Sequence, residues 1–72
     1  MRFSHAFLRI YDRKIASGEI TFSRSGIDKN DFTRLCIDPD YVISQEALEL
    51  VCDRMHLDQE ERDLLYRLAD YD

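Results

Sequence analysis

Apolar residues in this chain recur at intervals of three and four positions, which is the spacing that places side chains on one face of an α-helix. In the first stretch the recurring positions are Phe3, Phe7, Ile10, Tyr11 and Ile15. No segment alternates apolar and polar residues over the length of a strand. The pattern therefore predicts an all-α fold.

Helix-stop residues divide this pattern into five predicted helices. They lie near residues 4–16, 19–25, 29–37, 45–56 and 59–69. Gly18 is expected to end the first helix, and Gly26 suits a left-handed residue that ends the short second one. The second and third helices are therefore joined by a tight glycine turn.

Candidate N-caps stand at the start of each longer helix. Ser4, Asp28, Ser44 and Asp58 carry side-chain oxygens that can accept hydrogen bonds from the free N–H groups of a first helical turn. Asp58 is followed three positions later by Glu61, which predicts reciprocal capping, and Asp31 stands in a similar position after Asp28.

The inward-facing positions predict one core in a single domain that spans residues 1–72. The residues expected to be largely buried are Phe7, Ile10, Phe32, Leu35, Leu48, Val51, Leu64, Leu65 and Leu68. Cys36 and Cys52 stand beside apolar positions, where an unpaired cysteine behaves as a small buried hydrophobe. Their spacing relative to His5 and His56 is not that of a zinc site, so no metal is expected.

Charge is divided unevenly along the chain, whose net charge is −5. Residues 1–36 contain seven Lys or Arg against four acids, a net of +3. Residues 37–72 contain three Arg against eleven acids, a net of −8. Two interpretations are open: the first half faces a polyanionic partner, or the two halves attract each other within the fold.

The stretch Ser25-Gly-Ile-Asp-Lys-Asn-Asp-Phe-Thr-Arg-Leu35 combines the glycine turn with the start of the third helix. A helix-turn-helix needs this arrangement, with the second of its helices exposing residues to base edges. Phe32 and Leu35 occupy buried positions. The side chains free to point outward are Lys29, Asn30, Thr33 and Arg34. Lys and Arg can donate to guanine, Asn can pair with adenine, and Thr offers a hydroxyl or a methyl group.

This stretch resembles the helix-turn-helix of the lambda-repressor-like family, of the Cro/C1 type. The matching residues are Gly26-Ile27-Asp28-x-x-x-Phe32-Thr33-Arg34-Leu35, and the five-helix order extends the resemblance over nearly the whole chain. The resemblance implies a five-helix bundle with the motif in its second and third helices. It also implies a small bacterial or phage transcriptional regulator that binds duplex DNA, commonly as a homodimer, with the third helix in the major groove. The expected DNA-binding residues are Lys29, Asn30, Thr33, Arg34 and Arg24.

Some positions depart from the family pattern and favour an alternative. Gly18 stands where the family usually has a glutamine, and Phe22 where it usually has a small residue. Asp28 and Asp31 place negative charge where DNA phosphates would lie. The alternative is a protein-interaction module, such as an antitoxin-like or inhibitor protein, that keeps the fold. It would bind a basic protein partner through its acidic C-terminal half, or imitate DNA with that half.

Other function classes have little support in the sequence. It contains no phosphate-binding glycine loop, no His-Glu-x-x-His and no serine elbow, so we expect neither an enzyme nor a cofactor. No apolar run approaches the roughly 20 residues of a membrane span. Charged residues from Arg9 to Lys14 interrupt the apolar segment that a signal peptide needs. We therefore expect a cytoplasmic protein with no membrane partner.

Overall fold

The computed structural model describes residues 1–71 and contains four α-helices in that range. They are α1 (Phe3–Ala16), α2 (Lys29–Ile37), α3 (Gln45–Arg54) and α4 (Gln59–Ala69). Residues 1–71 form no strand, which confirms the all-α prediction. None of these helices is long and apolar enough to cross a membrane.

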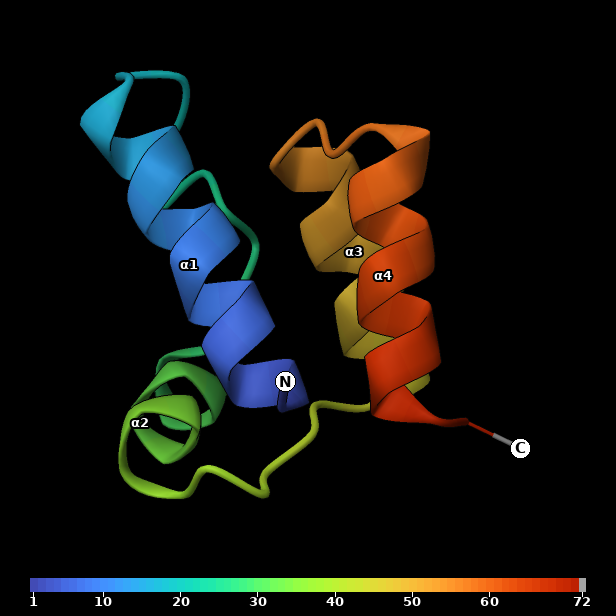
Figure 1. Cartoon of the computed structure of the whole chain (residues 1–72). Coiled ribbons are helices and arrows are strands. Elements are labelled where there is room, and N and C mark those ends of the chain that lie inside the picture. The colour runs from blue at the N-terminus through green and yellow to red at the C-terminus, as the bar shows by residue number, and fades with distance from the viewer. Residues whose placement is uncertain (72) are drawn as a thin grey trace.

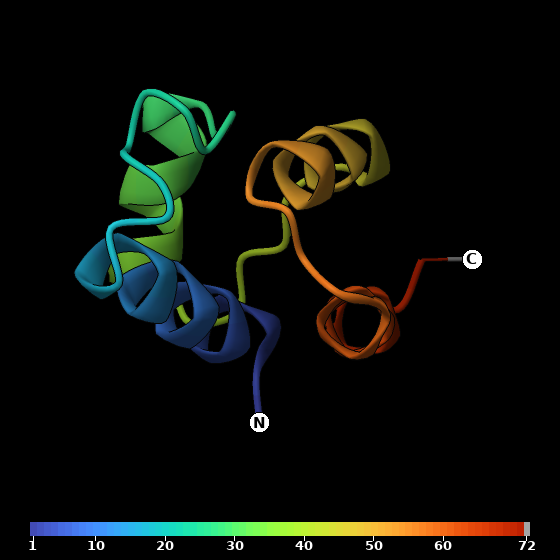
Figure 2. The ribbon, with the colours of Figure 1, turned by 90° about the horizontal axis from the view of Figure 1, so that it is seen from above.

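The first helix is the centre of the arrangement, because α1 packs against both α4 and α2. The α1 and α4 helices run antiparallel (Figure 1). Seen from above, α2 crosses α1 at a steep angle (Figure 2). The long connection from Ser17 to Asp28 returns the chain along α1 before α2 begins.

The helix predicted over residues 19–25 is absent, and this prediction is wrong. Thr21 to Ser25 form a single turn, in which the Ser25 N–H donates to the Thr21 carbonyl at 3.0 Å and the Ser25 hydroxyl donates to the Phe22 carbonyl at 2.7 Å. Gly18 and Gly26, both with a φ of +79°, bound this segment on either side. A helix of this length would make few backbone hydrogen bonds, too few to offset the entropy lost when its first turn is fixed. The side-chain hydroxyls of the segment form hydrogen bonds with its backbone groups instead.

Three of the predicted N-caps are confirmed. Asp28 accepts a hydrogen bond from the Asn30 N–H at 3.0 Å, and Ser44 accepts one from the Ala47 N–H at 3.1 Å. Asp58 forms the complete reciprocal cap with Glu61, with bonds of 2.8 and 3.0 Å. These local signals therefore set the starts of α2, α3 and α4.

Ser4 has a different role from the one predicted. It lies inside α1, is fully buried, and donates its hydroxyl to the Pro39 carbonyl at 2.8 Å. The residue at the N-cap of α1 is Arg2, which makes no side-chain cap. Ser4 thus ties the loop between α2 and α3 to the first helix.

The predicted core is confirmed at most positions. Six of the nine residues are buried: Phe7, Ile10, Leu35, Leu48, Val51 and Leu65. Phe32, Leu64 and Leu68 are partly buried against them. Cys52 is buried, but Cys36 is exposed because Leu35 takes the inward position of its turn.

Loop residues complete the core, and the helical pattern did not identify them as a group. Five buried apolar side chains come from connections between helices: Ile20, Ile27, Ile43, Met55 and Leu57. Four short helices leave gaps between their ends, and these buried side chains lie in the core between them. The connections are therefore held in place by burial as well as by hydrogen bonds.

The last described residue, Tyr71, fastens the end of the chain to the loop before α3. Its hydroxyl donates to the Ile43 carbonyl at 2.5 Å, and its ring meets Tyr66 edge-on at 6.1 Å between centroids. Burial, with smaller effects of Tyr66 and Cys52, raises the pKa of Tyr71 from 10.0 to about 12.

We expect Gly26→Ala to lower the free energy of unfolding more than Gly18→Ala. Both positions are left-handed, which costs a side chain roughly 1–2 kcal/mol. A Cβ at Gly26 would also lie 2.8 Å from Cγ of Arg54 and 3.3 Å from Cγ of Leu50, whereas nothing lies within 4 Å of one at Gly18. Urea denaturation should show a further loss of about 1–3 kcal/mol for Gly26→Ala. Equal losses of stability in the two variants would contradict the close approach of Arg54 and Leu50 to Gly26.

Tyr71 should make stability depend on alkaline pH. Because its pKa is higher in the folded protein than in the unfolded chain, its contribution is fully present below pH 10 and is lost as pH rises through about 12. Tyr71→Phe cannot ionise, so this part of the pH dependence should disappear. The urea midpoints of both proteins, measured across this pH range, test the prediction. An identical fall in the two proteins would contradict the buried hydrogen bond from Tyr71 to the Ile43 carbonyl.

Candidate functional site

The four predicted contact residues of α2 share one exposed face of that helix. Lys29 and Thr33 lie four positions apart, as do Asn30 and Arg34, and all four side chains are exposed. The opposite side carries the buried Leu35. We call Lys29, Asn30, Thr33 and Arg34 the outward face of α2.

Aromatic rings hold α2 in the position that exposes this face. Phe3, Phe7 and Tyr11 follow one another along α1 with centroid distances of 6.2 and 6.3 Å. Tyr11 then meets Phe32 of α2 at 5.0 Å, and Phe32 meets Phe22 of the preceding turn at 5.4 Å, edge to face. Tilted and edge-to-face ring pairs of this kind add about 0.5–1.5 kcal/mol each to the gain from burial.

Hydrogen bonds within α2 restrict what two of these side chains can do. The Thr33 hydroxyl donates to the Lys29 carbonyl at 3.0 Å, so while this bond holds Thr33 can accept from a partner or offer its methyl group. Asn30 donates its backbone N–H to Asp28, which leaves its side-chain amide for another contact. Both residues keep chemistry that suits a base edge.

Arg34 lies against an aromatic ring that comes from the next loop. Its guanidinium carbon is 5.6 Å from the centroid of Tyr41, within the range of a cation–π interaction. The Tyr41 hydroxyl donates to Asp31 Oδ1 at 2.5 Å. This hydrogen bond, followed by burial, raises the pKa of Tyr41 above 10.0. The prediction that Asp31 joins Asp28 in reciprocal capping is wrong, since Asp31 is engaged with Tyr41.

Arg24 is exposed but does not lie on α2. It belongs to the single turn before Gly26, where its backbone N–H donates to the Thr21 hydroxyl at 3.3 Å. The structure therefore brings four of the five predicted residues onto one helix and leaves Arg24 on the connection that leads to it.

Sequence reasoning missed two residues of this region, Tyr41 and Arg54. Arg54, in the last turn of α3, lies over Gly26, because a Cβ at that glycine would be 2.8 Å from its Cγ. Both residues are distant in sequence from the groups they touch, and Arg54 belongs to the half of the chain with a negative net charge. No local spacing signals either contact.

Ion pairs use several cations of the N-terminal half internally. Arg13 pairs with Glu61 of α4 at 2.6 Å, and Lys14 pairs with Glu19 at 3.0 Å and reaches Glu61 at 4.0 Å. Arg2 pairs with Asp40. Each of these three cations therefore pairs with an acid from residues 37–72, so the two halves of the chain attract each other at these positions. Arg24, Lys29 and Arg34 pair with no acid among residues 1–71.

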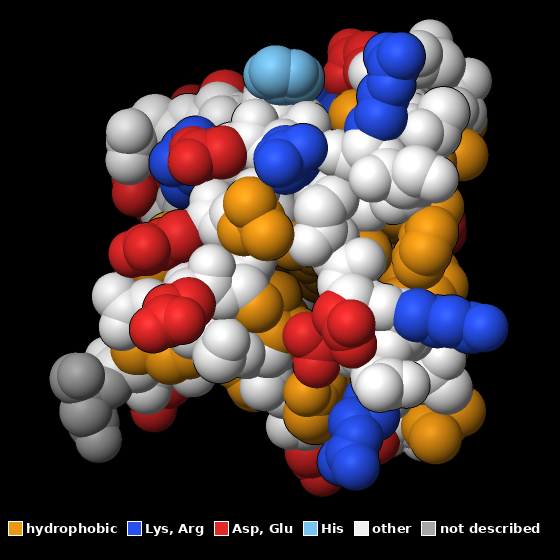
Figure 3. Space-filling view, turned by 180° about the vertical axis from the view of Figure 1, so that it is seen from behind, with side chains coloured by type: hydrophobic (Ala, Val, Ile, Leu, Met, Phe, Trp, Pro, Cys, Tyr) orange, Lys and Arg blue, Asp and Glu red, His pale blue; other side chains and the backbone are white. Residues whose placement is uncertain are grey.

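Positive charge does not form one broad patch on the side of the molecule seen from behind. On the face shown in Figure 3, Lys and Arg side chains are separated from one another and interspersed with Asp and Glu. In the described chain, Lys or Arg side chains without an acidic partner occur on α2 and the turn before it, and also on α1, α3 and α4, at Arg9, Arg54 and Arg67. This pattern suits a small contact area better than a long basic groove.

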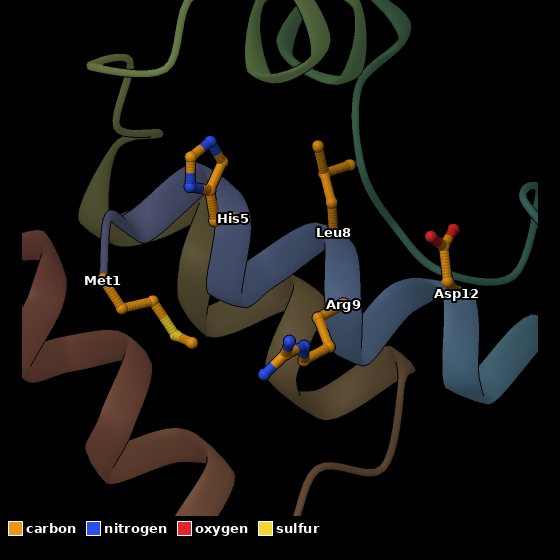
Figure 4. Close-up of a pocket in the computed structure, with 5 residues that line it drawn as sticks. All are labelled: Met1, His5, Leu8, Arg9 and Asp12. Carbon is orange, nitrogen blue, oxygen red and sulfur yellow. The ribbon is translucent and has the colours of Figure 1, made fainter.

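A depression along α1 has a volume of about 590 Å³. Its lining residues are Met1, His5, Leu8, Arg9 and Asp12. In Figure 4, His5, Leu8 and Asp12 point to one side of α1, and Met1 and Arg9 point to the other. Within residues 1–71, no group of three or more His, Cys, Asp and Glu side chains is placed to hold a metal ion.

We expect Phe32→Ala to destabilise the protein by about 3–5 kcal/mol, the usual cost of removing a packed aromatic ring. Phe22→Ala is the matched control, because Phe22 is 39% exposed and touches the same ring from outside, so its loss should cost clearly less. Thermal or urea denaturation measures both. A smaller loss for Phe32→Ala than for Phe22→Ala would mean that Phe32 does not seat α2.

Comparisons with protein-family models, with curated proteins and with solved structures found no match to this chain.

Proposed function

We propose that this protein is a small DNA-binding transcriptional regulator of the Cro/C1 type that places α2 in the major groove. The observation that carries the proposal is the outward face of α2, where four side chains capable of reading bases lie opposite a buried face. In this proposal the single turn Thr21–Ser25 stands in place of the first helix of the motif, and α2 is its reading helix.

Each side chain has a chemical role in the proposed complex. Lys29 and Arg34 donate to guanine, Asn30 pairs with adenine, and Thr33 accepts a hydrogen bond or contacts a thymine methyl group. Arg24 neutralises a phosphate next to the groove. Phosphate contacts supply most of the affinity and base contacts supply the specificity.

The proposal extends to assembly and location. A single short helix with few cations offers limited affinity, and two copies bound to half-sites one helical turn apart would add their contacts. We therefore propose a homodimer that acts in the cytoplasm, where it meets duplex DNA. The proposed protein binds and regulates, and it has no catalytic role.

One observation favours the alternative of a protein-interaction module. Glu46, Glu49 and Asp53 are exposed on α3, and Leu50 among them is 45% exposed. An acidic helix face with an apolar centre fits a basic amphipathic partner segment. In that case the fold is a scaffold of the antitoxin-like or inhibitor type, and α3 rather than α2 is the contact surface.

Titration against duplexes tests the DNA proposal. From a random duplex pool we expect selection of a preferred sequence, for which Lys29→Ala and Arg34→Ala each lose about 1–3 kcal/mol and relax the preference at one position. Arg24→Ala should weaken all duplexes alike and reduce the salt slope by about one. Asp28→Asn should strengthen binding, because Asn caps a helix about as well as Asp but carries no charge.

Arg67→Ala is the matched control, because it removes one exposed cation from α4 and leaves α2 intact. Affinity should change little in this variant. If the wild type selects no duplex at low salt, the DNA proposal fails. Loss of binding to a basic protein partner on Glu49→Lys, with Lys29→Ala unaffected, would then support the interaction module.

A further inference from the structure

Tyr41 touches two residues of α2 that lie three positions apart. Its hydroxyl donates to Asp31 at 2.5 Å, and its ring lies beneath the guanidinium of Arg34 at 5.6 Å. Asp31 and Arg34 stand at the spacing at which opposite charges on a helix surface normally attract each other. Within residues 1–71, however, Arg34 makes no ion pair, and the carboxylate of Asp31 is bound to Tyr41.

We propose that Tyr41 is a positioning residue that keeps Arg34 available for a base by holding the Asp31 carboxylate away from it. The inference rests on the proposed DNA-binding function and adds a residue outside α2 to it. Tyr41 does not contact DNA in this proposal. It acts by keeping the guanidinium of Arg34 out of an ion pair with Asp31.

The two contacts of Tyr41 differ in the way this role requires. A hydroxyl bound to a carboxylate is a charge-assisted hydrogen bond, stronger than a neutral one, and it occupies the acid. A ring face attracts a guanidinium without using any of its five N–H donors. Guanine recognition needs two of those donors in the plane of the guanidinium. Tyr41 therefore orients Arg34 and leaves its donors unused, whereas an ion pair with Asp31 would consume them.

The hydrogen bond from Tyr41 also holds the negatively charged carboxylate of Asp31 in place near the proposed interface. A carboxylate at the start of a reading helix repels phosphates, whose neutralisation drives binding. Asp31 is partly buried and held by Tyr41, whereas Asp28 is exposed at the N-cap. Releasing Asp31 would therefore harm binding in two ways: it would compete for Arg34, and it would become free to approach the DNA backbone.

A double-mutant cycle on a selected duplex tests the inference. Tyr41→Phe keeps the ring and removes the hydroxyl, so in the wild-type background it should weaken binding about 2- to 5-fold, the factor that a competing surface ion pair can exert. In the Asp31→Asn background the same change should cost nothing, since no carboxylate is released. In the Arg34→Ala background, Tyr41→Phe should weaken binding less than in the wild type, because the released Asp31 has no Arg34 with which to form an ion pair.

Tyr66→Phe is the matched control, since it removes a partly buried tyrosine hydroxyl on α4 and should leave affinity unchanged. If Tyr41 only shapes its loop, Tyr41→Phe will weaken binding equally with Asp31 and with Asn at that position. Equal losses overturn the inference and leave the proposed function standing.

A measurement without DNA separates the two proposals. The Cζ carbon resonance of Tyr41, followed against pH, should give a pKa above 10.0 in the wild type and a lower one in Asp31→Asn. No difference between the two proteins would overturn the inference whatever the protein binds. A clear difference together with no duplex binding by the wild type would mean that the contact exists but the DNA function, and with it this role, is wrong.

Discussion

The contact between Tyr11 of α1 and Phe32 of α2 is the interaction on which the candidate site depends. Between α1 and α2 there is no further helix to brace α2, since Thr21 to Ser25 form only one turn. The helix is instead held by a row of rings that begins at Phe3 and ends at Phe22. Residues 3, 7 and 11 are spaced by four along α1, so one helix face supplies a continuous aromatic surface. This surface sets which side of α2 is turned away from the protein.

Several charged side chains of this protein stabilise the fold through helix caps and ion pairs. Glu61 illustrates this, because it completes the cap of α4 and accepts Arg13 of α1. Exposed pairs of this kind contribute only about 0–1 kcal/mol each, but they fix which cations are engaged. Within residues 1–71, Lys29 and Arg34 of α2 and Arg24 beside it have no acidic partner, and the same holds for Arg9, Arg54 and Arg67 on the other helices. A net charge of −5 is therefore compatible with a small cationic contact surface.

The acids at the start of α2 show how one residue can serve the helix and oppose a polyanion. Asp28 supplies the hydrogen bond that a first turn needs, and a negative charge there also suits the helix dipole. The same charge opposes phosphate binding. Asp31 has no capping role, and its engagement with Tyr41 leaves the outward face with Lys29, Asn30, Thr33 and Arg34. The balance between these effects distinguishes a DNA-reading helix from a helix that is only a scaffold.

The sequence by itself determined the helical class, the extents of α1 and α2 to within a residue, and the caps at Asp28, Ser44 and Asp58, because these depend on neighbours within one turn. It also identified the exposed residues of α2 from their spacing against Leu35. Only the tertiary structure decided that residues 19–25 form no helix and that Ser4 binds Pro39. It alone placed Tyr41 between Asp31 and Arg34, and Arg54 over Gly26. These contacts join residues from separate elements, and no periodicity reports them, since they arise from the way short helices close around loop side chains such as Ile27 and Ile43.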